Sequence, residues 1–327
     1  MTDLDLTMTL LDTPEWLPFQ FDPAAGRVDW LRMTEADYRA ASFLDQRVLR
    51  PDSEFRQSGW PAMPAVARRD ADYIFHIGNV GSTLISRLLG ELPTVFALRE
   101  PLLLRTAAEG QFETLAALFS RTFRPAQRAM VKATSFTSEI ADRMVRPGSR
   151  ALFLYATPGH YLENILAGEN SWQTLQALSP VRLDRLRGRC PGLEADIGAM
   201  HDGLKAALGW ACEMTSLEGA AARLPAGTVM WLDFDVFLAD PERHFAAIAA
   251  HFGHPAPDAE AICAGPLMGR YSKALEYEYS PDLRREILAD ARRRHGGAIR
   301  DALNWLETLE SRYPAVARAI RRARAEG

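Results

Sequence analysis

The stretch IFHIGNVGSTLISRLLG, residues 74–90, constrains the fold of this chain more than any other part of it. A short apolar run leads into a turn with two glycines, and an amphipathic run follows. This order is typical of a β-strand, a tight loop and an α-helix, whose first free N–H groups and dipole favour an anion. Glycines let the backbone turn tightly, and hydroxyl side chains add donors. We therefore predict a phosphate- or sulfate-binding loop made of Gly78, Asn79, Val80, Gly81, Ser82 and Thr83.

The loop matches neither of two common nucleotide-binding patterns. In the Walker A pattern G-x-x-x-x-G-K-(S/T), Gly81 would be the second glycine. The first glycine would then fall on His76 and the lysine on Ser82. The dinucleotide pattern G-x-G-x-x-G is not present either. The sequence therefore argues against a conventional ATPase or GTPase, and a glycine turn that only joins a strand to a helix remains an alternative.

Apolar runs and helical segments alternate after the loop, which indicates the fold class. Besides the strand at 72–77, we predict strands in four later runs, at 94–98, 129–133, 150–158 and 227–234. Between them the pattern predicts helices, among them one at 134–148 and an interrupted one at 101–123. Strands that alternate with helices favour a parallel sheet covered on both faces. We therefore expect an α/β fold with three layers.

The chain divides into three regions by composition. Residues 1–70 are rich in aromatic residues, Pro and Asp, and we expect one helix in TEADYRAASFLDQRVL with loops packed on the core around it. Residues 71–280 form the predicted α/β core, in which the helical stretch 159–223 is a lid or substrate wall. Residues 281–327 form a basic helical tail, for which a solvated helix face is the simplest interpretation.

Charge and composition narrow the class of protein. The 38 basic and 42 acidic residues give a net charge of −4, which does not suggest nucleic acid as a partner. The cysteines Cys190, Cys212 and Cys263 lie far apart, so we expect reduced, buried thiols. The first twelve residues carry acids where a signal peptide needs bases. No run approaches the roughly 18 apolar residues of a membrane span. We therefore expect a soluble cytoplasmic protein without a membrane span.

Charged residues stand at the ends of two predicted strands that follow the loop. Arg99 and Glu100 directly follow the strand predicted at 94–98, and Lys132 lies near the end of the strand predicted at 129–133. The carboxyl ends of parallel strands line one crevice, so these residues should face the loop. There a Glu can take a proton from an acceptor hydroxyl, and a Lys can stabilise charge on a leaving oxygen. A surface charge or an ion pair is the alternative for each residue alone.

At this point the sequence resembles the P-loop sulfotransferase superfamily, which uses 3'-phosphoadenylyl sulfate (PAPS). GNVGSTLISRLL is similar to that family's 5'-phosphosulfate loop, (K/R)-S-G-(S/T)-T-x-L. REP (99–101) and KAT (132–134) resemble the segments that supply a catalytic Glu and a Lys on the transferring group, here Glu100 and Lys132. LFLYATP (152–158) stands where the family has its 3'-phosphate strand. Residues 231–253 resemble the family's segment Y-E-D-L…D-P…I…F-L-G. RYSKALEYEY (270–279) resembles a late nucleotide-binding segment, which implies Arg270 and Lys273 as donor-binding residues.

The chain departs from the family pattern at three positions. The basic residue of the loop falls on Asn79, the arginine that grips the 3'-phosphate falls on Ala156, and the serine eight positions later falls on Asn164. Each missing charged hydrogen bond forfeits about 1.5–3 kcal/mol. Candidates for compensation are His76, Arg87, Arg99, Arg270, Lys273 and the arginine-rich stretch VRLDRLRGRC.

The resemblance implies an enzyme that moves a sulfuryl group from PAPS to a hydroxyl or amine acceptor, without a metal. The alternative from another class is a sulfotransferase-like binding or scaffold protein that has lost its donor, which Asn79 and Ala156 favour. A phosphoryl transferase is a third interpretation, kept open by Asp233 and Asp235 after the last predicted strand. The expected partners are the nucleotide sulfate donor and an unidentified acceptor.

Overall fold

A five-stranded parallel sheet lies at the centre of the computed structural model, which describes residues 10–255, 258–271, 276 and 278–325. The strand order is β5 (Val95–Arg99), β6 (Arg128–Lys132), β4 (Asp72–His76), β7 (Ala151–Tyr155) and β8 (Val229–Asp233), and every neighbouring pair is parallel. Most residues of these strands are buried, because helices cover both faces. The predicted α/β class is confirmed.

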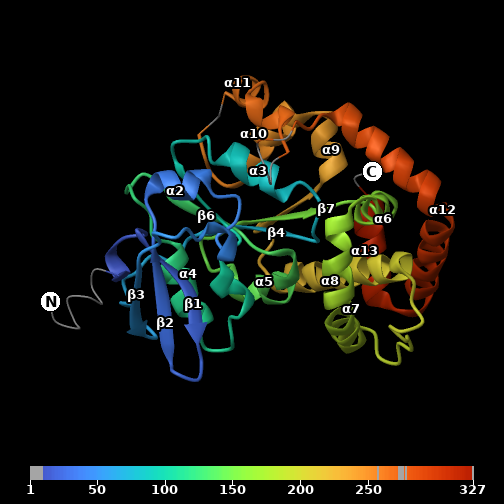
Figure 1. Cartoon of the computed structure of the whole chain (residues 1–327), viewed down its shortest axis with the longest axis horizontal. Helices are drawn as coiled ribbons and strands as arrows, with labels where there is room; N and C mark the ends of the chain where they lie inside the picture. Colours follow the sequence, from blue (N-terminus) through green and yellow to red (C-terminus); the bar gives the residue numbers. More distant parts are fainter. Residues whose placement is uncertain (1–9, 256–257, 272–275, 277, 326–327) are drawn as a thin grey trace.

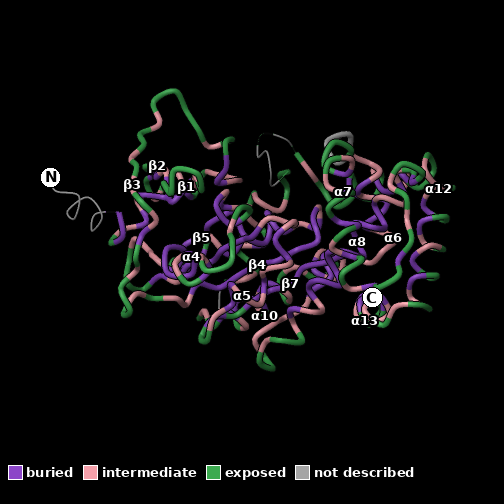
Figure 2. Tube along the Cα trace, turned by 90° about the horizontal axis from the view of Figure 1, so that it is seen from below, coloured by how far each residue is buried: buried purple, intermediate pink, exposed green. Residues whose placement is uncertain are grey.

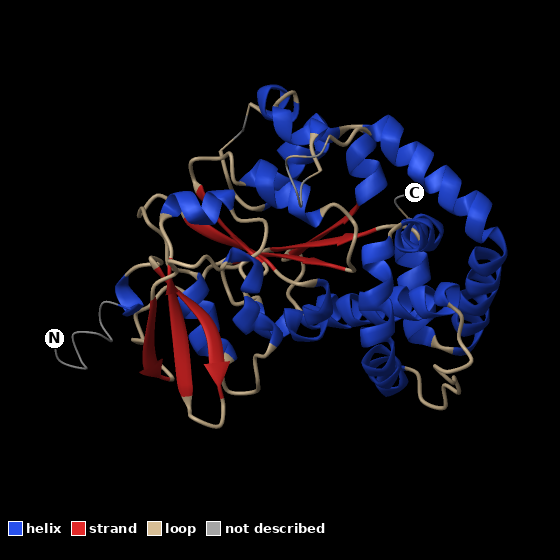
Figure 3. Cartoon of the chain, in the orientation of Figure 1, coloured by secondary structure: helices blue, strands red, loops and turns tan. Residues whose placement is uncertain are grey.

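Helices flank the sheet on both sides (Figures 1 and 3). Figure 1 shows α3 (Ser82–Leu89) and α10 (Pro241–His251) above the strands, and α4 (Phe112–Phe119) and α5 (Ala141–Met144) below them. The predicted break near Gly110 is confirmed, because a 3-10 turn (Leu102–Arg105) precedes α4 and Gly110 has φ +85°. The helix predicted at 134–148 is shorter than expected: a 3-10 stretch, η3 (Ser135–Ile140), precedes α5.

The helical stretch after β7 forms a bundle beside the sheet. It consists of α6 (Pro158–Ala167), α7 (Glu169–Arg189) and α8 (Asp202–Arg223), with α7 packed along α8. The tail continues this bundle, since α12 (Pro281–Arg312) packs on α6 and α8, and α13 (Pro314–Arg324) packs on α8. Figure 2 shows the inner side of these helices buried. The tail is therefore helical, as expected, but it has a buried apolar face as well as a solvated one.

Besides α10, three shorter elements lie between β8 and the tail. They are α9 (Phe234–Ala239), α11 (Ala259–Cys263) and a 3-10 turn (Pro266–Gly269). All three cysteines are buried free thiols, as predicted. In the described part of the chain, no helix is both long and apolar enough to cross a membrane.

The N-terminal region corrects the sequence analysis. Instead of loops it forms a three-stranded antiparallel sheet, β1 (Trp16–Asp22), β2 (Arg27–Arg32) and β3 (Phe55–Gly59). The single predicted helix is also wrong: only α2 (Glu35–Ala40) and a 3-10 turn (Gln46–Val48) form. A Thr34–Asp37 capping box starts α2. Its early end has a physical cause, because Arg99 Nη1 donates to the carbonyl oxygens of residues 38, 39 and 41.

The N-terminal sheet shares the main hydrophobic core with the central sheet. Leu17, Phe19 and Leu31 belong to the same buried cluster as the β4 and β7 side chains. A second, smaller cluster around Trp16 and Trp30 joins this sheet to Leu118 of α4. Residues before β4 thus contribute to the packing around the central sheet.

Candidate functional site

The predicted anion-binding loop lies between β4 and α3, as the sequence suggested. Gly78, Asn79 and Gly81 all have left-handed backbone conformations, with φ of +92°, +53° and +69°. A non-glycine residue in this region is uncommon, so Asn79 marks a specifically shaped turn. Gly81 occupies the position before the first turn of α3, which begins at Ser82. The free N–H groups of that first turn therefore face outward from the end of β4, where an anion is favoured.

His76 sets the shape of the loop from below. Its Nδ1 accepts a hydrogen bond from the Gly78 N–H at 3.1 Å, and its Nε2 lies 2.9 Å from the Ala133 carbonyl oxygen. This arrangement requires the neutral tautomer protonated on Nε2. His76 is thus a structural part of the turn and not a compensating cation. The Gly78 N–H is committed to His76, so the anion-binding donors of the loop begin after Gly78.

Two partners hold the loop from outside it. The Asn164 amide donates to the Asn79 carbonyl oxygen, so the residue that stands where the family has serine fixes the turn itself. The ring of Phe234 lies directly on Gly81: a Cβ at that position would be 1.9 Å from Cε2 of the ring. Gly81 is therefore required both for its φ and for this close contact.

A Gly81→Ala variant should destabilise the protein more than its left-handed backbone alone explains. Gly227 is the matched control, because its φ of +79° is similar and a Cβ added to it would have no neighbour within 4 Å. We expect Gly227→Ala to cost about 1–2 kcal/mol from the backbone alone. Gly81→Ala should cost about 1–3 kcal/mol more, because Phe234 or the loop must shift. Urea unfolding measures both, and equal losses would contradict the contact.

Buried hydroxyl groups next to the loop have no partner among the described residues. Thr83 Oγ1 in the first turn of α3 and Thr134 Oγ1 after β6 are both shielded from solvent and make no hydrogen bond there. A buried hydroxyl without a partner costs free energy, so such groups are rare in native proteins. Thr83 follows β4 through the loop, and Thr134 follows β6, which pairs with β4. Both therefore lie after the strand ends where an anion is expected. A phosphate or sulfate oxygen would satisfy such donors.

Glu100 and Lys132 form an ion pair at the carboxyl ends of β5 and β6. Lys132 Nζ donates to Glu100 Oε1, and the Glu100 N–H donates to the Lys132 carbonyl oxygen at 2.7 Å. Lys132 is fully buried, and burial lowers its pKa. Glu100 has φ +54°, which is a strained conformation for this residue type. The structure thus brings together the two residues that the strand-end argument selected.

Arg87 and Arg99 donate hydrogen bonds to the N-terminal region. Arg99 is buried under the N-terminal segment, whose carbonyl oxygens it binds, and burial lowers its pKa to about 9. Arg87 Nη2 donates to Ser42 Oγ at 2.7 Å. Both arginines therefore join the N-terminal region to the core, and the prediction that they compensate for missing loop charges is not supported by their contacts.

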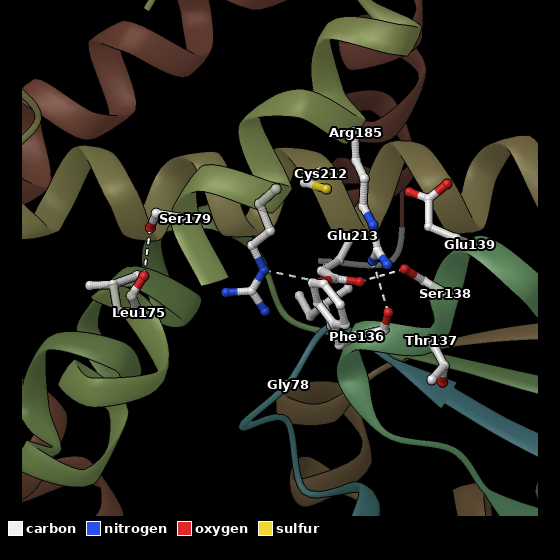
Figure 4. Close-up of polar contacts among 12 residues, drawn as sticks. Gly78, Phe136, Thr137, Ser138, Glu139, Leu175, Ser179, Arg185, Cys212 and Glu213 are labelled. Atoms are coloured by element: carbon white, nitrogen blue, oxygen red, sulfur yellow. Dashed lines mark hydrogen bonds and ion pairs between the residues drawn. The ribbon is translucent and has the colours of Figure 1, made fainter. Parts of the chain in front are cut away.

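Arg182, in the arginine-rich stretch of α7, forms a buried ion pair with Glu213 of α8 (Figure 4). Arg182 Nε donates to Glu213 Oε1 at 3.1 Å, and Ser138 Oγ donates to Glu213 Oε2. Burial raises the pKa of Glu213 against the attraction of Arg182. Arg185 donates to the Phe136 carbonyl oxygen and lies over the Phe136 ring, 3.7 Å from its centre. This cluster joins the bundle to η3, which borders the loop because Ser135 Cβ lies 3.2 Å from a Cβ built on Gly78.

A pocket opens beside the loop, on the side of α9 and α12. Its wall includes loop residues, α6, α9, the late segment and the start of α12, namely Asn79, Gly81, Leu84, Asn164, Phe234, Leu238, Met268, Arg270, Tyr271, Tyr279, Ser280, Pro281 and Arg284. The rings of Tyr271 and Tyr279 lie 5.7 Å apart at its edge. Of the two predicted donor-binding residues of the late segment, Arg270 lines this pocket and Lys273 lies outside the described residues.

The position of the family's 3'-phosphate arginine holds no cation. Ala156 is buried, and its carbonyl oxygen accepts a hydrogen bond from Trp210 Nε1 at 3.0 Å. Trp210 is itself completely buried, which makes it a core residue. The side chain at position 156 therefore contributes to packing and carries no charge.

Asp235 organises a polar group behind the pocket. Its Oδ1 accepts from Arg284 Nη2 at 2.6 Å and its Oδ2 lies 2.9 Å from His160 Nδ1. Its N–H donates to Asp233 Oδ1 at 2.7 Å. The hydrogen bond to Asp235 raises the pKa of His160. Asp233 and Asp235 are thus joined by a hydrogen bond, and Asp235 also connects His160 of α6 to Arg284 of α12. Among the described residues, no three His, Cys, Asp or Glu side chains come together as metal ligands.

The sequence analysis missed several residues of this site. Phe234 is the last residue of a predicted strand and gave no signal for its contact with Gly81. Arg284 was counted with the solvated tail. Its one sequence signal is spacing, because Arg284 precedes the buried Leu288 and Ala291 by four and seven positions and so lies on the apolar side of α12.

No protein-family model matches this sequence, and no curated protein does so either. Solved structures do. The sulfotransferase domain of the curacin biosynthetic pathway is 14% identical, with a TM-score of 0.42 over 68% of this chain and 89% of its own. A sulfotransferase from Alicyclobacillus acidocaldarius is 19% identical, with a TM-score of 0.35 over 72% and 97%. A mouse sulfotransferase complexed with PAP is 12% identical, with a TM-score of 0.35 over 73% and 90%. All three of these solved structures are sulfotransferases.

Proposed function

We propose that this protein transfers a sulfuryl group from PAPS to a hydroxyl or amine acceptor. The observation that carries the proposal is the Glu100–Lys132 ion pair at the ends of β5 and β6. β6 pairs with β4, and β4 leads directly into the loop, so both residues belong to the strand ends that border the expected anion site. The resemblance of the loop, REP and KAT segments to the sulfotransferase pattern points to the same three parts.

In the proposed reaction an acceptor oxygen or nitrogen attacks sulfur while the bond from sulfur to the bridging phosphate oxygen breaks. Glu100 takes the proton from the acceptor, and 3',5'-adenosine bisphosphate leaves. Lys132 stabilises the negative charge that develops on the bridging oxygen. The N–H groups of the first turn of α3, with the Ser82 and Thr83 hydroxyls, hold the 5'-phosphate. Catalysis of this kind depends on positioning and charge stabilisation.

Backbone strain at Glu100 supports a role beyond packing. A non-glycine residue with positive φ costs on the order of 1–3 kcal/mol, and such strain gathers at functional sites. Glu100 keeps this strained conformation while its carboxylate pairs with Lys132. The unpartnered Thr83 and Thr134 hydroxyls support an oxyanion ligand at the same place.

The second candidate function is a binding or scaffold protein built on this fold. It is favoured by Ala156, which leaves the 3'-phosphate position without a cation, and by Glu100, which already neutralises the buried Lys132. The phosphoryl-transferase interpretation has less support, because Asp233 and Asp235 are engaged with Thr157, His160 and Arg284.

Calorimetric titration with 3',5'-adenosine bisphosphate separates these candidates. We expect micromolar binding of the bisphosphate. We expect weaker binding of 5'-AMP, because it lacks the second phosphate that the proposed site recognises despite Ala156. ATP serves as the control for a phosphoryl transferase. No binding of the bisphosphate would refute the proposal, and preferential binding of ATP would favour phosphoryl transfer.

A further inference from the structure

The nucleotide that we propose carries a phosphate monoester on its ribose, which needs a positively charged partner. A dianionic phosphate is bound most strongly by charge-assisted hydrogen bonds, above all from arginine. Neither Ala156 nor Asn79 provides such a group. Arg270 of the late segment lines the pocket beside the loop but is exposed, so a buried cation in this pocket must come from another element.

Arg284, in the first turn of α12, brings a guanidinium group into this pocket from the far end of the chain. It lines the pocket together with Gly81 and Asn164, and its side chain is only 7% exposed. Its Cζ lies 5.5 Å from the centre of the Phe234 ring, the same ring that packs on Gly81. The loop, the Phe234 ring and the Arg284 guanidinium thus lie next to one another along one wall of the pocket.

The hydrogen bonds of Arg284 leave donors available. Its Nη2 binds Asp235 Oδ1 at 2.6 Å, while Nε and Nη1 make no hydrogen bond with the residues that the structure describes. Asp235 divides its oxygens between Arg284 and His160, so it fixes the guanidinium without occupying it. A buried guanidinium with free N–H groups at a pocket wall is suited to bind a further anion.

We infer that Arg284 recognises the ribose phosphate of the nucleotide, in place of the arginine that the family pattern has at position 156. This inference rests on the proposed function, since it names the residue that reads one group of the same ligand. Asn164 lines the same pocket and Arg270 lies at its exposed edge. Asp235 and His160 act as positioning residues for the guanidinium.

Calorimetry of an Arg284→Gln variant with two nucleotides tests this role. We expect the variant to lose about 10- to 100-fold in affinity for 3',5'-adenosine bisphosphate, the range for a lost charged hydrogen bond. Its affinity for 5'-AMP should stay within about 3-fold, because 5'-AMP lacks the phosphate that Arg284 contacts. The readout is the ratio of the two affinities, which a general loss of structure would not change selectively.

Arg285→Gln is the matched control, because Arg285 is the next residue of α12, is largely exposed and, among the residues that the structure describes, pairs with Asp282 alone. Its affinity ratio should equal that of the wild type. If Arg284→Gln does not fold, as judged by thermal unfolding, Arg284→Lys takes its place: it keeps the charge but loses the planar fork and should show a smaller, still selective loss.

Two outcomes would overturn the inference, and they differ from failure of the proposed function. Unchanged affinities for both nucleotides in a folded variant, or an equal loss for both, would show that Arg284 does not read the ribose phosphate. In either case the wild type still binds the bisphosphate. If the wild type itself does not bind it, the proposed function fails and this inference fails with it.

Discussion

Glu100→Gln should lower the rate of sulfuryl transfer by about 10²- to 10⁴-fold, the usual contribution of a general base. The amide keeps the size of the side chain and can still accept a hydrogen bond from Lys132, but it cannot take a proton from an acceptor. The affinity for 3',5'-adenosine bisphosphate should stay within a few-fold, because Glu100 does not line the pocket beside the loop. Formation of labelled product from labelled PAPS with a panel of phenols, alcohols and amines measures the rate.

Glu109→Gln is the control for this experiment. Glu109 pairs with Arg143 at the surface and its side chain is 80% exposed, so its loss should leave transfer unchanged. If Glu100→Gln abolishes nucleotide binding instead of transfer, Glu100 is a structural partner of Lys132. The roles assigned to the ion pair would then be wrong.

Glu213→Ala should lower the free energy of unfolding by about 3–5 kcal/mol, which is the cost of breaking a buried ion pair. The substitution leaves the buried Arg182 without its counter-charge and Ser138 without its acceptor. Urea denaturation of the variant and the wild type measures the difference. Because the pair joins α7 and α8 to η3, we also expect looser packing of η3 against the loop, which hydrogen exchange would detect.

Two further variants identify the cause of that loss. Asp184→Ala removes an exposed partner of Arg187 on the same helix α7 and should cost about 0–1 kcal/mol. The double variant Arg182→Met/Glu213→Met removes both charges together. It should be much less destabilised than Glu213→Ala, because an apolar pair of similar volume needs no counter-charge. A loss in Glu213→Ala no greater than in Asp184→Ala would contradict the importance of the buried pair.

The strands of the central sheet were predictable because the sheet is buried on both faces. Such strands appear as short continuous apolar runs, and each of the five was found near its correct place. The N-terminal sheet was missed although a signal was present. The segment Asp22–Gly26 forms a turn, in which Asp22 Oδ1 accepts from the Ala24 N–H at 2.9 Å and Gly26 has φ +62°. Aromatic residues flank it on both sides and the β-branched Val28 follows it, which is the pattern of a β-hairpin.

The candidate site was predictable only where topology fixes it. Glu100 and Lys132 follow neighbouring parallel strands, so the rule for strand ends was sufficient to place them together. Phe234 and Arg284 reach the pocket because α9 and α12 pack where they do, which depends on contacts between segments far apart in sequence. The contacts of Arg87 and Arg99 depend in the same way on the N-terminal region, which the sequence did not place.

The neutral His76 under the loop has a consequence for ligand binding. Together with the Asn164 amide, it holds the turn in its shape through contacts within the protein, before any ligand arrives. A loop that is already ordered avoids the entropy cost of immobilisation, which is about 0.5–1.5 kcal/mol for each side chain that a ligand would otherwise fix. Preorganisation of this kind offsets part of what the loop loses by having Asn79 in place of a basic residue. Asn164 thus acts on the loop through its backbone, by donating to the Asn79 carbonyl oxygen.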